Sequence, residues 1–115
     1  MSDMTIWHNP RCSKSRQTLA LMQENGVEPV IRLYLEDPPD AAELRRLLDL
    51  LGQPVTALLR KGEAEYKEHF AAIAGDETAC LELLARYPKV IERPVVIVGN
   101  RAVLGRPPEN VLALL

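Results

Sequence analysis

Segments with the pattern of β-strands occur near the two ends of this 115-residue chain, and the long stretch between them is predicted to be helical. Near the start, strands are expected over 5–8 and 30–35, with a helix over 13–25 as the right-handed crossover that two parallel strands require. Near the end, residues 95–98 and 101–104 flank the dipeptide Gly99-Asn100, a two-residue turn typical of a β-hairpin. The chain is therefore expected to be an α/β protein with a mixed four-stranded sheet.

The middle of the chain, about 40–90, is predicted to be a helical insertion between the second strand and the hairpin. Asp40 followed by Glu43 has the pattern of a capping box and predicts a helix that runs to Leu51 and closes at Gly52. Its buried stripe is expected to consist of Leu44, Leu47, Leu48 and Leu51. Further helical segments are expected over 55–59, 63–72 and 77–87. A last helix is expected to start at Gly105-Arg106-Pro107-Pro108, because proline suits a first turn, and to pack down through 111–115. The helix over 77–87 is expected to bury Cys80, Leu83, Leu84 and Tyr87.

The order strand, helix, strand, helical block, hairpin and helix is the plan of the thioredoxin-like fold with a helical insertion. A chain of this length with 47% hydrophobic residues can bury one ordinary core, so residues 1–115 are expected to form a single domain. Pro94 stands just before the third strand, where that fold places a cis-proline loop beside the active thiol. A cis bond before Pro94 is therefore a hypothesis.

Charge and cysteine content narrow the classes of function. The net charge of −2 provides no global attraction for nucleic acid or an anionic membrane, so neither is an expected partner. Two cysteines without framework spacing, no signal-peptide pattern in residues 1–5 and no apolar run long enough to span a bilayer favour the cytoplasm. The two histidines and two cysteines lack the spacing of metal ligands, so no metal site is expected.

Cys12 follows the first strand at the start of the first helix, and this position favours a thiolate. Free backbone N–H groups and the positive end of the helix dipole stabilise an anion there, and Arg11, Lys14 and Arg16 add positive charge. The Ser15 hydroxyl is expected to turn toward the sulfur and donate a hydrogen bond. An isolated cysteine is more often a small buried hydrophobe, but the turn, the cations and the Cys-x-x-Ser spacing together indicate a reactive nucleophile.

Two further residues, His8 and Cys80, are of types that could take part in thiol chemistry. His8 lies close to Cys12 in sequence and could tune its charge, whereas a lone histidine on a strand is more often structural. Cys80 shares the apolar face of its predicted helix with leucines. It is expected to be buried with a raised pKa and to serve packing rather than chemistry.

Five separated motifs occur in the order found in one family. They are His8-Asn9-Pro10-x-Cys12, Tyr34-Leu35-Glu36-x-Pro38-Pro39, Leu58-Leu59-Arg60-Lys61, Ile91-x-Arg93-Pro94 and Arg106-Pro107. With these motifs almost the whole chain resembles the glutaredoxin-linked arsenate reductases of the ArsC family. The resemblance implies that Cys12 attacks arsenate, that glutathione displaces the thiol-bound arsenic, and that glutaredoxin completes reduction to arsenite. It implies glutathione as a co-substrate and no bound cofactor.

The resemblance also implies that Arg60, Arg93 and Arg106 bind the oxyanion. Guanidinium groups suit that task, because they stay charged and hold two oxygens at once. Spacing alone would leave each of them a solvated surface cation. Ser13-Lys14 stand where the plasmid-borne enzymes carry Gly-Thr, and the C-terminal extension of those enzymes is missing, so the chain resembles the shorter chromosomal branch. The natural substrate of that branch is less certain.

Other thiol proteins remain as alternatives. Spx-like regulators, which share this plan and bind RNA polymerase, typically carry Cys-x-x-Cys, whereas Ser15 stands here. Monothiol glutaredoxins continue with Gly-Phe-Ser after the cysteine, and this chain does not. A low-molecular-weight phosphatase or a thioredoxin-linked arsenate reductase needs Cys-x5-Arg, but residue 18 is threonine. A thiol oxidoreductase acting on another substrate stays open, as do selectivity over phosphate and the oligomeric state.

Overall fold

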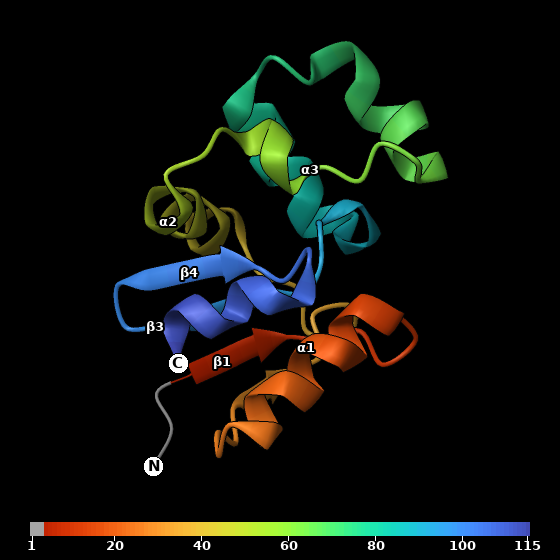
Figure 1. The fold of residues 1–115 in the computed structure, drawn as a ribbon. Helices are drawn as coiled ribbons and strands as arrows, with labels where there is room; N and C mark the ends of the chain where they lie inside the picture. Colours follow the sequence, from red (N-terminus) through yellow and green to blue (C-terminus); the bar gives the residue numbers. More distant parts are fainter. Residues whose placement is uncertain (1–3) are drawn as a thin grey trace. The chain divides into compact units, whose positions relative to one another are not determined.

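The computed structural model of the chain describes residues 4–115 (Figure 1). Residues 1–3, which belong to the stretch 1–5 that lacks a signal-peptide pattern, lie outside this range. The chain divides into two compact units. The sheet unit comprises the described residues up to Tyr34 together with Arg93–Leu115, and the helical unit comprises Leu35–Glu92. The helical unit takes in the whole insertion predicted over 40–90, and the assignment of both units to a single domain stays a prediction.

The sheet unit contains the predicted mixed four-stranded sheet. Its strands are β1 (Met4–Trp7), β2 (Val30–Arg32), β3 (Val95–Val98) and β4 (Arg101–Leu104). Their order is β2-β1-β3-β4, with β1 and β2 parallel and the other two pairs antiparallel. The predicted hairpin joins β3 to β4, and Gly99 supplies the positive φ of 54° that its turn requires.

Strand β2 is shorter than predicted. It was expected over 30–35 but ends at Arg32, because its partner β1 ends opposite, at Trp7. One more bond, from the His8 N–H to the Arg32 carbonyl at 2.8 Å, closes the ladder before the chain turns away. The apolar pattern in the sequence thus predicts a longer strand than the neighbouring strand β1 can pair with.

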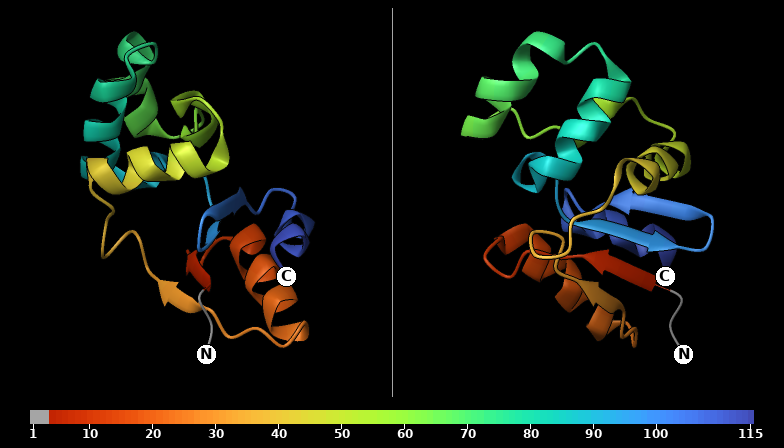
Figure 2. Two further views of the ribbon diagram at one scale, coloured as in Figure 1. Left: turned by 90° about the vertical axis from the view of Figure 1, so that its left-hand side faces the viewer. Right: turned by 180° about the vertical axis from the view of Figure 1, so that it is seen from behind.

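Two helices of the sheet unit lie side by side and contact each other, as the left-hand view in Figure 2 shows. They are α1 (Ser13–Glu24), which precedes the left-handed Gly26 at φ 80°, and the C-terminal 3₁₀ helix η5 (Pro108–Leu114). They pack on the sheet around a core of Met4, Ile6, Met22, Val96, Val111 and Leu114. This packing holds the start of α1, and with it Cys12, at the carboxyl end of β1.

The helical unit begins with the predicted capped helix α2 (Ala41–Leu51). The Glu43 N–H donates to Asp40 Oδ1 at 2.8 Å, and the Asp40 N–H donates to Glu43 Oε1 at 3.2 Å, which confirms the capping box. Gly52 ends the helix with a positive φ of 65°. Three of the four predicted stripe residues are buried, but Leu51 in the last turn is only half-buried.

The remaining helical segments of this unit are less regular than predicted. They are η1 (Val55–Leu58), the π-helical turn η2 (Tyr66–Phe70), η3 (Ala71–Ile73), α3 (Glu77–Arg86) and η4 (Pro88–Val90). The prediction for the buried face of α3 was partly wrong, because Leu81 is buried while Leu83 and Tyr87 are only half-buried. Helix α3 contacts α2, η1, η2 and η4, so its buried stripe is set by several neighbours rather than by one flat surface. Within residues 4–115, no helix has the length and apolar character needed to cross a bilayer.

Candidate active site

A short loop connects β1 to α1 and presents Cys12 as the residue that caps the helix. The Cys12 N–H donates to the Asn9 carbonyl at 3.0 Å, and the Arg11 N–H donates to Asn9 Oδ1 at 3.0 Å. The Arg16 guanidinium reaches back to the Pro10 carbonyl at 2.8 Å. Cys12 itself has extended backbone angles, and its carbonyl accepts the first bond of the helix from the Arg16 N–H. Its sulfur therefore occupies the place of an N-cap oxygen.

The surroundings of Cys12 favour its charged form. Burial alone would raise the pKa of the thiol, since its residue is 8% exposed. A hydrogen bond from the Arg93 side chain, the backbone N–H groups of Ser15 and Lys14, and the positive charge of Arg93 outweigh that effect. The pKa of Cys12 is consequently lower than that of an ordinary cysteine.

Two arginines from the C-terminal part of the chain meet at this sulfur. Besides the contact from Arg93, a terminal nitrogen of Arg106 lies 3.7 Å from Cys12 Sγ. Two bonds tie their segments together, because Arg106 Nε donates to the Arg93 carbonyl at 2.8 Å and the Gly105 N–H donates to the Pro94 carbonyl at 2.9 Å. The predicted cis bond before Pro94 is present, and a second one precedes Pro107, which was not predicted.

Gly105 allows this tied segment to lie directly against α1. A Cβ atom at this position would lie 2.6 Å from the Thr18 hydroxyl oxygen and 2.7 Å from a ring carbon of Pro94. Thr18 is fully buried on α1, one turn beyond Lys14, whose carbonyl accepts a bond from the Thr18 hydroxyl at 2.9 Å. The helix that carries the thiolate and the segment that carries the arginines are therefore in direct contact.

The Ser15 side chain has a different arrangement from the expected one. Its oxygen lies 2.6 Å from His8 Nδ1 and accepts the Asn9 N–H at 3.0 Å, while the contact of Ser15 with the sulfur is made by its backbone N–H. Both His8 and Ser15 are buried. Burial, followed by the charge of Arg16, lowers the pKa of His8, so the ring is neutral at pH 7. His8 and Ser15 therefore stabilise the loop that precedes Cys12.

Known proteins resemble this chain over nearly all of its length. The model of the ArsC family matches residues 7–114. The chain belongs to the ArsC family. Among its relatives, an arsenate reductase of Neisseria meningitidis is 38% identical over 117 residues, with all of both chains covered. The uncharacterized protein YfgD of Escherichia coli is 50% identical over 112 residues, covering 96% of this chain and 94% of its own.

A solved structure extends the likeness to the fold. The arsenate reductase from Vibrio cholerae superimposes on this ArsC-family chain with a TM-score of 0.90 and 44% sequence identity, covering 97% of each. The thioredoxin-like fold predicted for the chain is thereby confirmed.

Arg60 and Cys80, to which the sequence assigned a role in this ArsC protein, belong to the helical unit. Arg60 pairs with Glu92 at 2.9 Å and with Glu63 at 3.5 Å, and its role in substrate binding stays a prediction. Cys80 is fully buried, and its thiol lies 3.4 Å from the Ile73 carbonyl, which accepts its hydrogen. Burial and the charge of Asp76 raise the pKa of Cys80, in agreement with the expected packing role.

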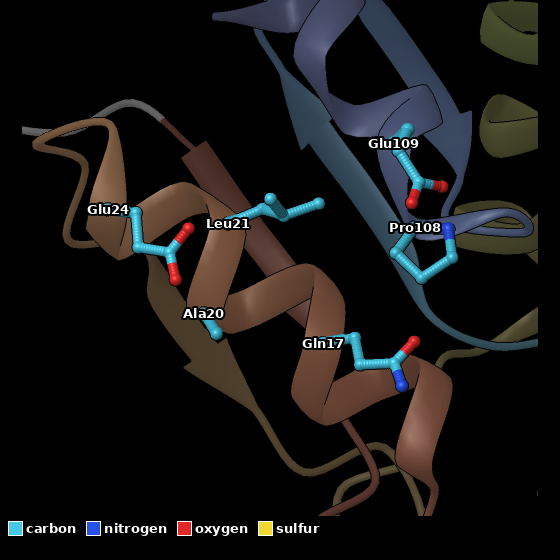
Figure 3. Close-up of a pocket in the computed structure, with 6 residues that line it drawn as sticks. All are labelled: Gln17, Ala20, Leu21, Glu24, Pro108 and Glu109. Carbon is cyan, nitrogen blue, oxygen red and sulfur yellow. The ribbon is translucent and has the colours of Figure 1, made fainter.

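A separate pocket of about 280 Å³ lies between α1 and η5 (Figure 3). It is lined by Gln17, Ala20, Leu21, Glu24, Pro108 and Glu109. Two carboxylates and no cation occur among these residues, so the pocket does not suit an oxyanion. Among residues 4–115, no three side chains of the types that bind metals are grouped as a site.

One residue of the ArsC site was not assigned a role from the sequence. Tyr34, just beyond β2, is fully buried, and it contributes to the electrostatic surroundings of Arg93. Burial alone would lower the pKa of Arg93, but its contacts with Cys12 and Tyr34 raise it. In the sequence, Tyr34 opens one of the five family motifs and follows an apolar strand, but neither feature assigned it a role.

The charge state of Cys12 leads to a testable expectation. The rate of its alkylation by iodoacetamide should rise with pH and reach half of its maximum below the value for free cysteine, about 8.5. The thiolate also stabilises the fold, because a lowered pKa in the folded state contributes stability at high pH that is lost as pH falls through that pKa. The measurement is alkylation against pH, followed by mass spectrometry that separates Cys12 from Cys80. A midpoint at or above that of free cysteine would contradict the described electrostatics.

Proposed function

We propose that this chain is an arsenate reductase that uses glutathione and glutaredoxin. The observation that carries the proposal is the contact of one low-pKa thiolate, Cys12, with two guanidinium groups, those of Arg93 and Arg106. Arsenate at neutral pH is a tetrahedral oxyanion of one to two negative charges, and a thiolate must approach it against that charge. Fixed arginines lower this repulsion and stabilise the transition state. The names of several relatives support the same substrate.

The first step forms a bond between sulfur and arsenic. The Cys12 thiolate attacks As(V), one As–O bond breaks, and the departing oxygen takes up protons and leaves as water. Arg93 and Arg106 bind the remaining oxygens and the negative charge that builds up on them. No oxidation or reduction takes place in this step, because arsenic stays As(V) and gains a thiol ligand.

The second step transfers two electrons. A glutathione thiolate attacks the Cys12 sulfur, a disulfide bond forms, and the electron pair of the S–As bond passes to arsenic, which leaves as arsenite. Glutaredoxin then attacks the glutathione sulfur of the mixed disulfide and restores the Cys12 thiolate. We place the enzyme in the cytoplasm, where such thiols are kept reduced.

An external thiol is needed because the chain offers no suitable second cysteine. Ser15 occupies the position of the resolving thiol in a dithiol motif, and a hydroxyl cannot form a disulfide. The thiol of Cys80 is fully buried, bonded to a carbonyl and raised in pKa, all of which oppose its attack on an adduct.

The test of this function is arsenite production by the pure protein. With arsenate, glutathione and glutaredoxin present, we expect repeated turnover, and omission of glutathione should stop the cycle after the first step, with arsenic bound to Cys12 and no arsenite released. Phosphate in place of arsenate serves as the control oxyanion. Absence of arsenite, together with capture of RNA polymerase by the same protein, would favour the Spx-like alternative.

Replacing Cys80 by alanine is expected to leave arsenite production unchanged. The substitution removes the buried thiol group of Cys80, so the free energy of unfolding should fall by about 1 kcal/mol. Turnover and urea denaturation of the variant measure the two effects. A Cys12–Cys80 disulfide found by mass spectrometry after arsenate treatment would contradict the scheme and point to an internal reductant.

A further inference from the structure

Two exposed cations flank Cys12 along the chain. Arg11 directly precedes the thiol, and Lys14 lies in the first turn of α1, two residues after it. Both side chains are exposed, whereas Cys12 is only 8% exposed. A molecule that reaches the sulfur must therefore lie against the residues on either side of it, and these two are positively charged.

Arg11 and Lys14 have no ion-pair partner among the residues that the structure describes, and the first turn of α1 contains no acidic residue. Arg16, the third cation of this stretch, differs, because its guanidinium donates to a backbone carbonyl of the loop at 2.8 Å. The groups that lower the pKa of Cys12 are Arg93 and backbone N–H groups. The side chains of Arg11 and Lys14 are therefore left for a ligand.

The thiol that the proposed function requires has matching charges. Glutathione carries its thiol on the middle residue of a tripeptide, with a carboxylate toward each end, and it is a net anion at neutral pH. When its sulfur lies against Cys12, the carboxylates extend to either side, where Arg11 and Lys14 lie. An exposed pair of opposite charges contributes little by itself, but cations within a Debye length of about 8 Å also raise the local concentration of an anionic reagent.

We propose that Arg11 and Lys14 bind the carboxylates of glutathione and so select an acidic thiol as the reductant of the Cys12 adduct. In that step the glutathione sulfur forms the disulfide bond with Cys12, and the electron pair of the S–As bond passes to arsenic. The place of this step in a reaction rests on the proposed function, whereas the preference for an acidic thiol is a property of the site alone.

The test measures thiol–disulfide exchange at Cys12 and needs no arsenate. The Cys12 thiolate attacks a disulfide, a mixed disulfide forms, and the other half leaves as a thiolate. Three reagents differ in charge, because glutathione disulfide is anionic, 2-hydroxyethyl disulfide is neutral and cystamine is cationic. In the double variant Arg11→Gln, Lys14→Gln, the rate constant with glutathione disulfide should fall about 3- to 10-fold. The rate constant with the neutral reagent should stay unchanged, and that with cystamine should rise.

Arg101→Gln is the matched control for the loss of a positive charge. Arg101 pairs with Val98, and Val98 pairs with Met4, so Arg101 lies at the end of the sheet away from Cys12. All three rate constants should keep their parental values in this variant. Added salt should weaken the preference for glutathione disulfide in the parent protein but not in the double variant.

Three results would contradict the proposal or separate it from the proposed function. A parental rate constant with glutathione disulfide in the double variant would overturn it, and so would an equal fall with all three reagents, which would locate the effect in the thiolate itself. Slower reaction of the mixed disulfide with glutaredoxin alone would also overturn it, in favour of an acidic protein surface as the partner of these cations. A protein that makes no arsenite yet shows this charge selectivity would refute the proposed function and leave the thiol site intact.

Discussion

Replacing Cys12 by serine is expected to abolish arsenite production. At neutral pH a serine hydroxyl is almost entirely protonated and is a far poorer nucleophile than the thiolate that the structure stabilises. Without the sulfur, no adduct with arsenic and no mixed disulfide with glutathione can form. The measurement is arsenite release over many turnovers, together with mass spectrometry for a glutathione adduct on the protein.

The fold should tolerate this change, because Cys12 is the N-cap residue of α1 and serine is among the residues preferred at that position. Circular dichroism should therefore match that of the parent protein. Cys80→Ala is the matched control, since it also leaves the chain with one cysteine but keeps Cys12. Activity retained in Cys12→Ser would rule out Cys12 as the nucleophile.

Replacing Arg93 or Arg106 by alanine should reduce kcat/KM for arsenate strongly. Losing one well-placed charged donor costs about 2–4 kcal/mol of transition-state stabilisation, which corresponds to about 30- to 1,000-fold in rate. Lysine should restore little, because an ammonium group cannot hold two oxygens in the geometry of a guanidinium. Steady-state kinetics of the alanine and lysine variants measures both effects.

Arg101→Ala is the control for the loss of an arginine from the sheet unit. Arg101 lies on β4, and its guanidinium donates to the Ala113 carbonyl at 2.6 Å rather than to the site. Its kcat/KM should stay close to that of the parent. Parental turnover in both Arg93→Ala and Arg106→Ala would show that the oxyanion binds elsewhere.

Sequence patterns predicted those parts of the fold that local chemistry determines. The capping box at Asp40, the hairpin turn at Gly99 and the order of strands and helices all depend on near neighbours in the chain, and all are present. Where the length of a strand or the buried face of a helix depends on neighbouring elements, the sequence pattern alone was insufficient. Strand β2 ends where its partner β1 ends. Helix α3 buries Leu81, which was not predicted, because several elements surround that helix.

The candidate site was predictable to a similar degree. The position of Cys12 between a strand and a helix indicated a thiolate, because the start of a helix attracts negative charge whatever the rest of the fold. The contact of Arg93 and Arg106 with Cys12 joins residues far apart in sequence, and only the resemblance to a family suggested it. The ring of Tyr34 and the hydroxyl of Ser15 could not be placed in advance, since the direction of a side chain depends on its neighbours in space.

The charges along α1 run against the electrostatic preference of a helix. Lys14 and Arg16 lie in its first turn, which has no acidic residue, and its last turn has no basic residue and ends at Glu24. Each charge of this kind costs the helix about 0.3–1 kcal/mol. An oxyanion bound beside Cys12 adds negative charge to that of the thiolate at the start of the helix, and a ligand that binds only the folded state shifts the folding equilibrium toward it. The protein is therefore most resistant to unfolding, and to the proteolysis that follows unfolding, when its substrate is abundant.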